Sequence, residues 1–330
     1  MLKRIAISIG DLNGIGIELA LRNHREISAM VDPIYIIDPI MLTQAATLLK
    51  LPIPDDFQTL ESVGKPFTIE PGRVSVASGH YSYSSFLKAV ELAREQQVDA
   101  IITLPIHKKA WELAGIHYKG HTDALRDFFD AKAIMMLGCP QMYVALFTEH
   151  IPLREVAENI NEKDLTRFLV DFYTVIEMQA GDEVLNRQKI ALLGLNPHAG
   201  DDGVLGSEEQ IIKKSILNAH EILGKDIFTD PLVPDVAFTP KTRANYSYYI
   251  AMYHDQGLTP LKALYFDEGI NISLNLPILR TSVDHGTAFD IAYRGSEINS
   301  LSYLNAAKYI VSLRALQGDK HQNRSPKFEK

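Results

Sequence analysis

The sequence predicts an α/β fold built on a largely parallel sheet. Short runs of β-branched and aliphatic residues alternate along the chain with longer segments whose apolar residues recur at helical spacing. Glycine, proline, asparagine and histidine follow several of the short runs directly, and loops at that position bind ligands in open α/β sheets. The length of 330 residues allows one large α/β unit or two domains, at roughly 150 residues per domain.

The expected elements follow from these patterns in chain order. We expect strands at residues 5–9, 34–37, 100–103, 133–137, 143–147, 190–193, 236–238 and 249–252. We expect helices at 84–97, 164–178 and 208–223, and Ser207 with Gln210 three residues later predicts a capping box before the last of them. Residues 51–78 contain scattered prolines and glycines and receive no element, and the polar residues 318–330 are expected to form a loose tail.

Composition excludes several classes of protein. With 46% hydrophobic and 22% charged residues, the chain fits neither a disordered nor a fibrous protein. A formal net charge of -8 argues against a nucleic-acid partner. The single cysteine, Cys139, rules out an intrachain disulfide and fits a reducing compartment, so a cytoplasmic location is expected. The longest uncharged run, 133–148, is too short to span a membrane, and no membrane partner is expected.

Three histidines follow predicted strands and form a candidate metal site. His150, His198 and His254 each lie within a few residues of a strand end, and such ends share one edge of a parallel sheet. Neutral imidazole is a common metal ligand, and three protein ligands with an open position are typical of catalytic sites. Each histidine taken singly is better explained as a surface or buried structural residue than as a ligand, and the residues alone leave open whether the three meet.

A second group of polar residues lies near the C-terminal end. Lys262, Asn271 and Arg280 are interleaved with apolar runs and could clamp a phosphate or carboxylate through charge-assisted hydrogen bonds. Solvated surface side chains are the alternative, but an unpaired charge beside buried segments would be costly. The glycines of segment 10–16 permit a tight turn or a close ligand contact, and they match neither a dinucleotide fingerprint nor a P-loop.

Six ordered segments resemble the signature segments of the PdxA family of 4-hydroxythreonine-4-phosphate dehydrogenases. They are GDLNGIGIE from residue 10, GHTDAL from 120, TEHIPL from 148, LNPHAGDDGVLG from 195, AMYHDQGLTPLK from 251 and LPILRTSVDHGTAFDIA from 276. The resemblance implies an isocitrate/isopropylmalate-dehydrogenase-like α/β/α fold with two domains around a cleft, approximately 1–120 with 280–330, and 121–279. It also implies a homodimer with shared active sites, in which His254 could complete the site of the partner.

The activity that the resemblance implies is a metal-dependent and NAD-dependent oxidative decarboxylation, with NADP as an alternative cofactor. The substrate would be 4-phosphooxy-L-threonine, and the product would be 3-amino-2-oxopropyl phosphate on the route to pyridoxal phosphate. Relatives that oxidise other phosphorylated hydroxy acids, such as phospho-threonate or phospho-erythronate, are the alternative, because Leu12, Ile17, Asp123 and Asn275 depart from the usual motifs. A metal-dependent hydrolase and a non-catalytic phosphosugar-binding protein are the rival classes.

The resemblance also assigns roles to particular residues. The metal ligands would be His150, His198 and His254, with zinc expected and magnesium or cobalt as alternatives. The substrate-binding residues would be His121, Thr122, Lys262, Asn271 and Arg280. The group that removes the hydroxyl proton stays open among Asp235, Asp255 and Lys262, and no cofactor-binding residue is assigned.

Overall fold

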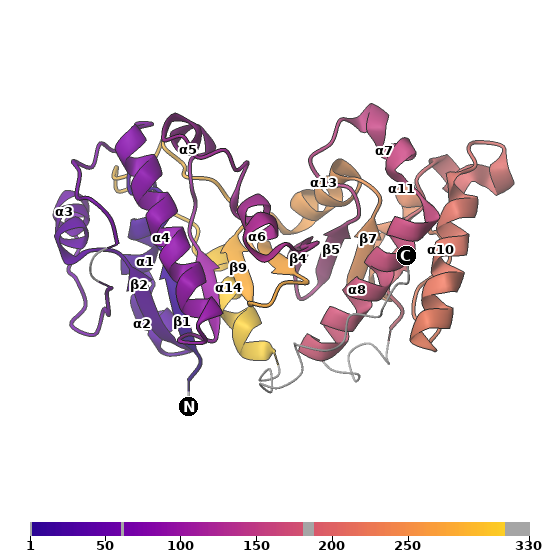
Figure 1. The fold of residues 1–330 in the computed structure, drawn as a ribbon, viewed down its shortest axis with the longest axis horizontal. Coiled ribbons are helices and arrows are strands. Elements are labelled where there is room, and N and C mark those ends of the chain that lie inside the picture. Colours follow the sequence, from indigo (N-terminus) through magenta and orange to yellow (C-terminus); the bar gives the residue numbers. More distant parts are fainter. Residues whose placement is uncertain (1, 61–62, 181–187, 314–330) are drawn as a thin grey trace.

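A mixed sheet crosses the whole molecule and carries helices on both faces. The computed structural model describes residues 2–60, 63–180 and 188–313. Within these ranges the sheet has nine strands in the order β2-β1-β3-β9-β8-β4-β5-β7-β6. Figure 1 shows the N-terminal part at one end of the sheet and the segment around α8 and α10 at the other, with the C-terminal helix α14 returning to the middle. The predicted α/β class is confirmed.

The strands pair in parallel at both ends of the sheet and antiparallel in its centre. The strands are β1 (Arg4–Ser8), β2 (Asp32–Ile36), β3 (Ala100–Thr103), β4 (Ile134–Cys139), β5 (Met142–Leu146), β6 (Ala191–Leu192), β7 (Tyr248–Ala251), β8 (Ile270–Leu274) and β9 (Arg280–Val283). β4 is antiparallel to β5 and β8, and β8 is antiparallel to β9. Three antiparallel pairings therefore interrupt the sheet that the sequence predicts as largely parallel.

The long helices cover the sheet, and short helical segments lie in the connections between strands. They are α1 (Gly16–Arg22), α2 (His24–Ser28), α3 (Pro39–Leu49), α4 (Val76–Arg94), α5 (Lys108–Leu113), α6 (His121–Phe129), α7 (Leu153–Asn159), α8 (Glu162–Ala180), the 3-10 segment η1 (Pro197–Gly203), α10 (Glu208–Leu223), α11 (Pro234–Ala237), α12 (Pro240–Arg243), α13 (His254–Tyr265) and α14 (Leu301–Ser312). None of the helices in the described ranges is long and apolar enough to cross a membrane.

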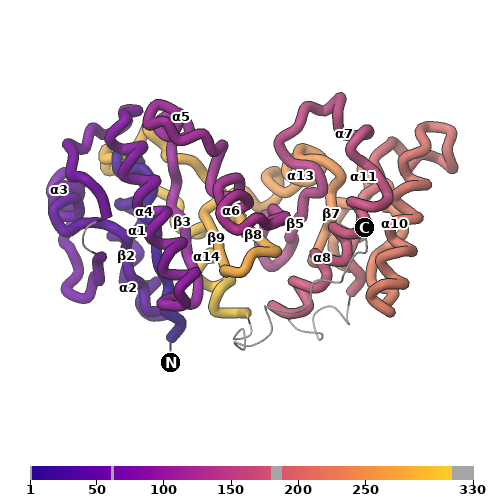
Figure 2. Tube along the Cα trace, viewed as in Figure 1, coloured from indigo at the N-terminus to yellow at the C-terminus, as the bar shows by residue number. Residues whose placement is uncertain are grey.

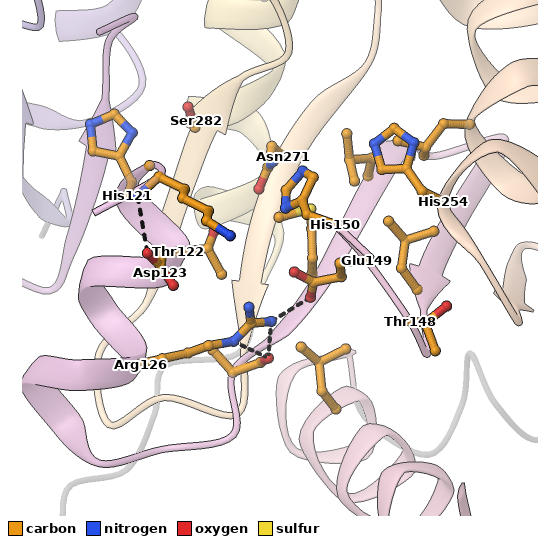
Figure 3. A pocket seen from close by; sticks show the side chains of 18 of the residues that line it. His121, Thr122, Asp123, Arg126, Thr148, Glu149, His150, His254, Asn271 and Ser282 are labelled. Atoms are coloured by element: carbon orange, nitrogen blue, oxygen red, sulfur yellow. Dashed lines mark hydrogen bonds and ion pairs between the residues drawn. The ribbon is translucent and has the colours of Figure 1, made fainter. Parts of the chain in front are cut away.

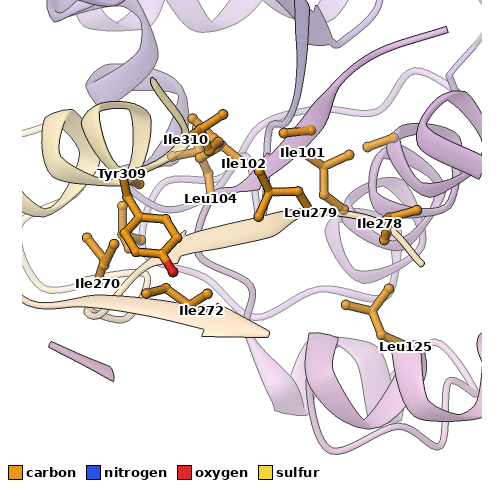
Figure 4. Close-up of a cluster of buried hydrophobic side chains, with 14 of the residues drawn as sticks. Ile101, Ile102, Leu104, Leu125, Ile270, Ile272, Ile278, Leu279, Tyr309 and Ile310 are labelled. Atoms are coloured by element: carbon orange, nitrogen blue, oxygen red, sulfur yellow. The ribbon is translucent and has the colours of Figure 1, made fainter. Parts of the chain in front are cut away.

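Alternate residues of the strands pack against different helices. Leu137 and Val144 belong to a buried cluster with Leu258 of α13, whereas their neighbours Met136 and Ala145 belong to the main core, which includes buried side chains of α8 and α10. Because successive strand side chains point to opposite faces, this part of the sheet is covered on both sides. Figure 2 shows the same layers along the Cα trace, and Figure 4 shows side chains of α14 against those of β3 and β8.

Two predicted features are wrong. Residues 236–238 do not form a strand, since Val236 and Ala237 lie in α11 and Phe238 follows its last residue. Pro234 is the first residue of this helix, and its fixed φ suits that position. The Ser207 side chain does not cap α10: its backbone is in the helical region rather than the extended region that capping requires, and only its carbonyl accepts a bond, from the N–H of Gln210.

Other segments went unassigned or were missed. β8 and β9 were not predicted because polar residues alternate with apolar ones in both strands. In the described part of residues 51–75 the chain is irregular, apart from one bridge between Thr59 and Tyr35, and Asp38 accepts the backbone N–H groups of Val63 and Gly64. The predicted tail, 318–330, lies outside the described residues.

Candidate active site

A cavity of about 860 Å³ lies where the middle strands meet α6 and α13. Its lining includes residues of four of the six signature segments, and that volume is typical of a small-molecule site. Figure 3 shows His121, His150, Asn271 and His254 around it. The structure therefore brings together most of the predicted site residues, which are His121, Thr122, His150, His254, Lys262, Asn271 and Arg280.

Arg280 is the buried cation of this cavity. Its Nη1 donates to Asn271 Oδ1 at 3.1 Å and to Ser273 Oγ at 3.0 Å, and its Nε and Nη2 donate to Thr103 Oγ1. These partners lie on β8 and β3, the two neighbours of β9. None of the three is charged. Burial lowers the pKa of Arg280 to about 9, so the guanidinium is still charged at neutral pH, and no carboxylate of the described residues pairs with it.

His121, the first residue of α6, lies against that guanidinium. Its Nδ1 is 3.4 Å from Arg280 Nη2, and the rings of Phe86 and Trp111 make edge contacts with the imidazole. Burial, and then the Arg280 charge, hold the pKa of His121 well below its usual value, so the ring is neutral. Nδ1 facing an arginine must be the acceptor, which puts the proton on Nε2. Nε2 is buried without a protein partner in the described chain, which fits a donor kept for a ligand.

Lys262 and Thr122 complete the polar wall. Lys262 Nζ lies 2.9 Å from Asp284 Oδ2, and both residues line the cavity together with Asn271. Thr122 Oγ1 lies 3.2 Å from Ser273 Oγ, which also accepts from Arg280. Neutral hydroxyls and two cations therefore line one region of the cavity, an arrangement suited to an anionic ligand.

His150 and His254 lie side by side on another part of the cavity wall. Their ring centroids are 5.5 Å apart, because each histidine follows one of the adjacent parallel strands β5 and β7. Burial is the main cause that lowers the pKa of His150 and favours the neutral imidazole that binds metals. His254 Nδ1 is 2.6 Å from Asp255 Oδ1.

The other predicted residues do not line this cavity. His198 is exposed in η1, where five consecutive residues, 198–202, have left-handed backbone angles. Asp235 is exposed on α11, which packs against η1, and Asp255 points outward with 80% of its side chain exposed. In the described ranges, no group of three or more His, Cys, Asp or Glu side chains has the geometry of a metal site. The three-histidine site stays a prediction.

Several site residues were missed by sequence reasoning. Arg126 of α6 pairs with Glu149, the residue before His150, and also donates to the carbonyl of Ala133. Thr103 ends a predicted strand, and Asp284 follows a strand that was not predicted. Their position at or after a strand end could have signalled Thr103, Glu149 and Asp284, whereas Arg126 lies within α6 and has no such signal.

Comparison with known proteins identifies the family. A family model described as pyridoxal phosphate biosynthetic protein PdxA matches residues 29–310. The chain belongs to the PdxA family. One relative, named 4-hydroxythreonine-4-phosphate dehydrogenase, from Sulfurimonas denitrificans, is 55% identical over 94% of this chain and 97% of its own length.

Solved structures agree with this placement in the PdxA family. A 4-hydroxythreonine-4-phosphate dehydrogenase structure from Klebsiella pneumoniae is 31% identical with a TM-score of 0.79, over 94% of this chain and 99% of that one. A terephthalate 1,2-cis-dihydrodiol dehydrogenase from Burkholderia xenovorans, 22% identical with a TM-score of 0.66 over 94% of this chain and 98% of that one, shares the fold. The predicted fold and family are confirmed. Asn275, at a position where PdxA proteins were expected to carry glycine, has a φ of 57°, a conformation that asparagine tolerates.

Proposed function

We propose that this PdxA chain oxidises and decarboxylates 4-phosphooxy-L-threonine with NAD, giving 3-amino-2-oxopropyl phosphate for pyridoxal phosphate biosynthesis in the cytoplasm. The observation that carries the proposal is the buried, uncompensated Arg280 charge beside the neutral His121, which together form an anion-binding wall. The names of the relatives supply the reaction, and the cavity supplies a place for a small phosphorylated acid.

The proposed substrate contacts have two roles, which are to neutralise the charge of the substrate and to fix its orientation. Arg280 and Lys262 would neutralise the phosphate and carboxylate groups, while the Nε2–H of His121 and the amide of Asn271 would fix their orientation. Such contacts far from the reacting carbon can align it for hydride transfer. Of the three candidates for the general base, only Lys262 lines the cavity. As an ammonium paired with Asp284 it has no lone pair to accept a proton, so we assign it to binding the substrate anion and not to removal of the hydroxyl proton.

A divalent metal fits part of the described site. His150 and His254 offer two imidazoles in one cavity, and these donors suit zinc or cobalt better than magnesium. A bound cation would lower the pKa of the substrate hydroxyl and polarise the oxygen after oxidation. His198 is the third proposed ligand, and it would reach the site from a partner subunit or through a shift of η1.

We therefore propose a homodimer whose active sites combine residues of both subunits. His150 and His254 lie together in one chain, whereas His198 and Asp235 lie on elements outside the cavity lining. The two domains would be residues 1–120 with 280–330, and 121–279. β1, β2, β3 and β9 occupy one half of the sheet order, and β8 to β6 occupy the other.

Mixed dimers test the shared site. Inactive His198→Ala and His150→Ala chains, once mixed, should regain part of the activity, because one of the two sites in each heterodimer keeps both histidines. His254→Ala mixed with His150→Ala is the matched control and should stay inactive, since this pair shares one cavity. Full activity of a monomer would contradict the shared site.

The activity itself is tested by NADH absorbance with 4-phosphooxy-L-threonine, NAD and zinc, with and without a chelator. NADH formation that the chelator abolishes supports the proposal. Phospho-threonate and phospho-erythronate are tested as alternative substrates. A higher kcat/KM for either than for 4-phosphooxy-L-threonine would mean that it is the substrate of this enzyme. Hydrolysis without NADH would instead indicate a metal-dependent hydrolase.

A further inference from the structure

Asp284 lines the cavity but has no role in the proposed reaction. It follows the last residue of β9 and lines the cavity opposite α13. Its Oδ2 lies 2.9 Å from Lys262 Nζ, and its side chain is 13% exposed against 37% for Lys262. The pair is therefore partly withdrawn from water, where charges are screened less than on the open surface.

The backbone that carries the Asp284 carboxylate is anchored by hydrogen bonds. The backbone N–H of Asp284 donates to Ser302 Oγ at 3.0 Å, and the same hydroxyl donates to the carbonyl of Gly269 at 2.6 Å. Ser302 is buried at the start of α14. Gly269 leaves room for the carboxylate, because a Cβ at this residue would lie 3.3 Å from Asp284 Oδ2. Asp284 is thus tied to the sheet and to α14, while Lys262 reaches it through four flexible methylenes.

One strand links this ion pair to the buried arginine. Arg280 and Asp284 are four residues apart, Arg280 opening β9 and Asp284 following its end, which separates their Cα atoms by roughly 13 Å at strand spacing. β9 is paired on both sides, with β3 and with β8, so its register does not slide. Because β9 carries both Arg280 and Asp284, the Asp284 carboxylate fixes the position of the Lys262 ammonium relative to the Arg280 guanidinium.

We propose that Asp284 is a positioning residue, which holds the Lys262 ammonium at a fixed distance from Arg280 so that both cations meet one doubly anionic substrate. An ammonium carries three donors, so the bond to Asp284 does not exhaust its capacity to bind substrate. Without Asp284 the lysine would sample other rotamers, and substrate binding would have to order it. This inference rests on the proposed function, because it assigns the substrate contact of Lys262.

The test is a double-mutant cycle with Asp284→Asn and Lys262→Met. Asparagine keeps the size of the side chain and removes its charge. We expect Asp284→Asn to raise KM for 4-phosphooxy-L-threonine about tenfold, with a smaller change in kcat, and calorimetry without NAD should show a matching loss of substrate affinity. In the Lys262→Met background the same substitution should change KM less than twofold, because the group it positions is already absent.

Two controls separate positioning from stability. Glu112→Gln removes the partner of Lys109 in an exposed ion pair, also at 2.9 Å, and should leave KM unchanged. Thermal melting should show that the Asp284→Asn protein is folded. A tenfold effect that persists in the Lys262→Met background would mean a structural role, and wild-type KM for Asp284→Asn would also overturn the proposal.

The calorimetric arm distinguishes this inference from the reaction itself. Wild-type chains that bind 4-phosphooxy-L-threonine but form no NADH would refute the proposed oxidation, while the Asp284 effect on binding would still decide the positioning role. Wild-type chains that do not bind this substrate at all would refute both.

Discussion

Thr103, the last residue of β3, accepts hydrogen bonds from two nitrogens of Arg280, the first residue of β9. Its Oγ1 lies 3.1 Å from Nε and 2.7 Å from Nη2, although the two residues are 177 positions apart in the chain. β3 and β9 are parallel neighbours, and Ile101 is the register partner of Arg280. The hydroxyl therefore sets the direction of the guanidinium fork from the side opposite Asn271 and Ser273.

Replacing Arg280 by alanine should separate phosphate binding from other effects. A charge-assisted hydrogen bond contributes about 1.5 to 3 kcal/mol, or roughly ten- to hundredfold in affinity. We expect Arg280→Ala to lower kcat/KM for 4-phosphooxy-L-threonine by at least that factor, and to have much less effect on a substrate without phosphate. Steady-state NADH kinetics on both substrates measure this. Equal losses on the two substrates would instead place Arg280 on the carboxylate or in a structural role.

Replacing Thr103 by valine should disturb Arg280 without touching the substrate. Valine matches threonine in shape but leaves buried guanidinium donors unsatisfied, at a cost of about 1–3 kcal/mol. We expect a lower melting temperature and weaker substrate binding. Thr103→Ser keeps the hydroxyl and serves as the control, which should bind substrate nearly as wild type does. If valine and serine behave alike, the hydroxyl does not orient Arg280.

Alanine substitution of each histidine tests the proposed metal. We expect one zinc per subunit after reconstitution, and a loss of that zinc in the variants His150→Ala, His198→Ala and His254→Ala. Elemental analysis gives the metal content, and circular dichroism shows whether the fold is kept. Full occupancy in one variant would remove that histidine from the ligand set, and His117→Ala, outside the cavity lining, is the matched control.

Glu209 anchors the strained turn that presents His198. Its buried carboxylate accepts the backbone N–H groups of Leu195 and Asn196, at 2.9 and 2.7 Å, and the Asn196 amide. Left-handed residues cost roughly 1–2 kcal/mol each when they are not glycine, so the turn at 198–202 needs such support. We expect Glu209→Ala to reduce zinc content and activity with the rest of the fold retained. Glu208→Ala, which removes one bond to Asn196, should have the smaller effect.

Acid should destabilise the protein through His121. Its pKa is well below the usual value in the folded chain, mainly because of burial, and close to 6.5 when unfolded. Below about pH 6.5 the unfolded chain takes up a proton that the folded chain does not, so the free energy of unfolding falls as the pH drops toward the folded-state pKa. Urea unfolding between pH 7.5 and 5.5 measures the slope. His121→Asn should flatten it, and an unchanged slope would show that His121 is not the group responsible.

The sequence by itself determined most of the strands and the family. β-branched runs predicted β1, β2, β3, β4, β5, β6 and β7 within a few residues, because side-chain period and burial are local properties. The signature segments indicated the PdxA family and seven of the residues that line the cavity, including Arg280 and His121.

Only the tertiary structure decided how these elements meet. β8 and β9 have mixed polar and apolar residues that look irregular in sequence, yet they lie in the centre of the sheet because Asn271, Ser273 and Arg280 satisfy one another there. Strand order and the antiparallel pairings of β4 also depend on contacts between distant segments. For the same reason, spacing along the chain could not show that His254 lies beside His150 while His198 stays outside the cavity lining.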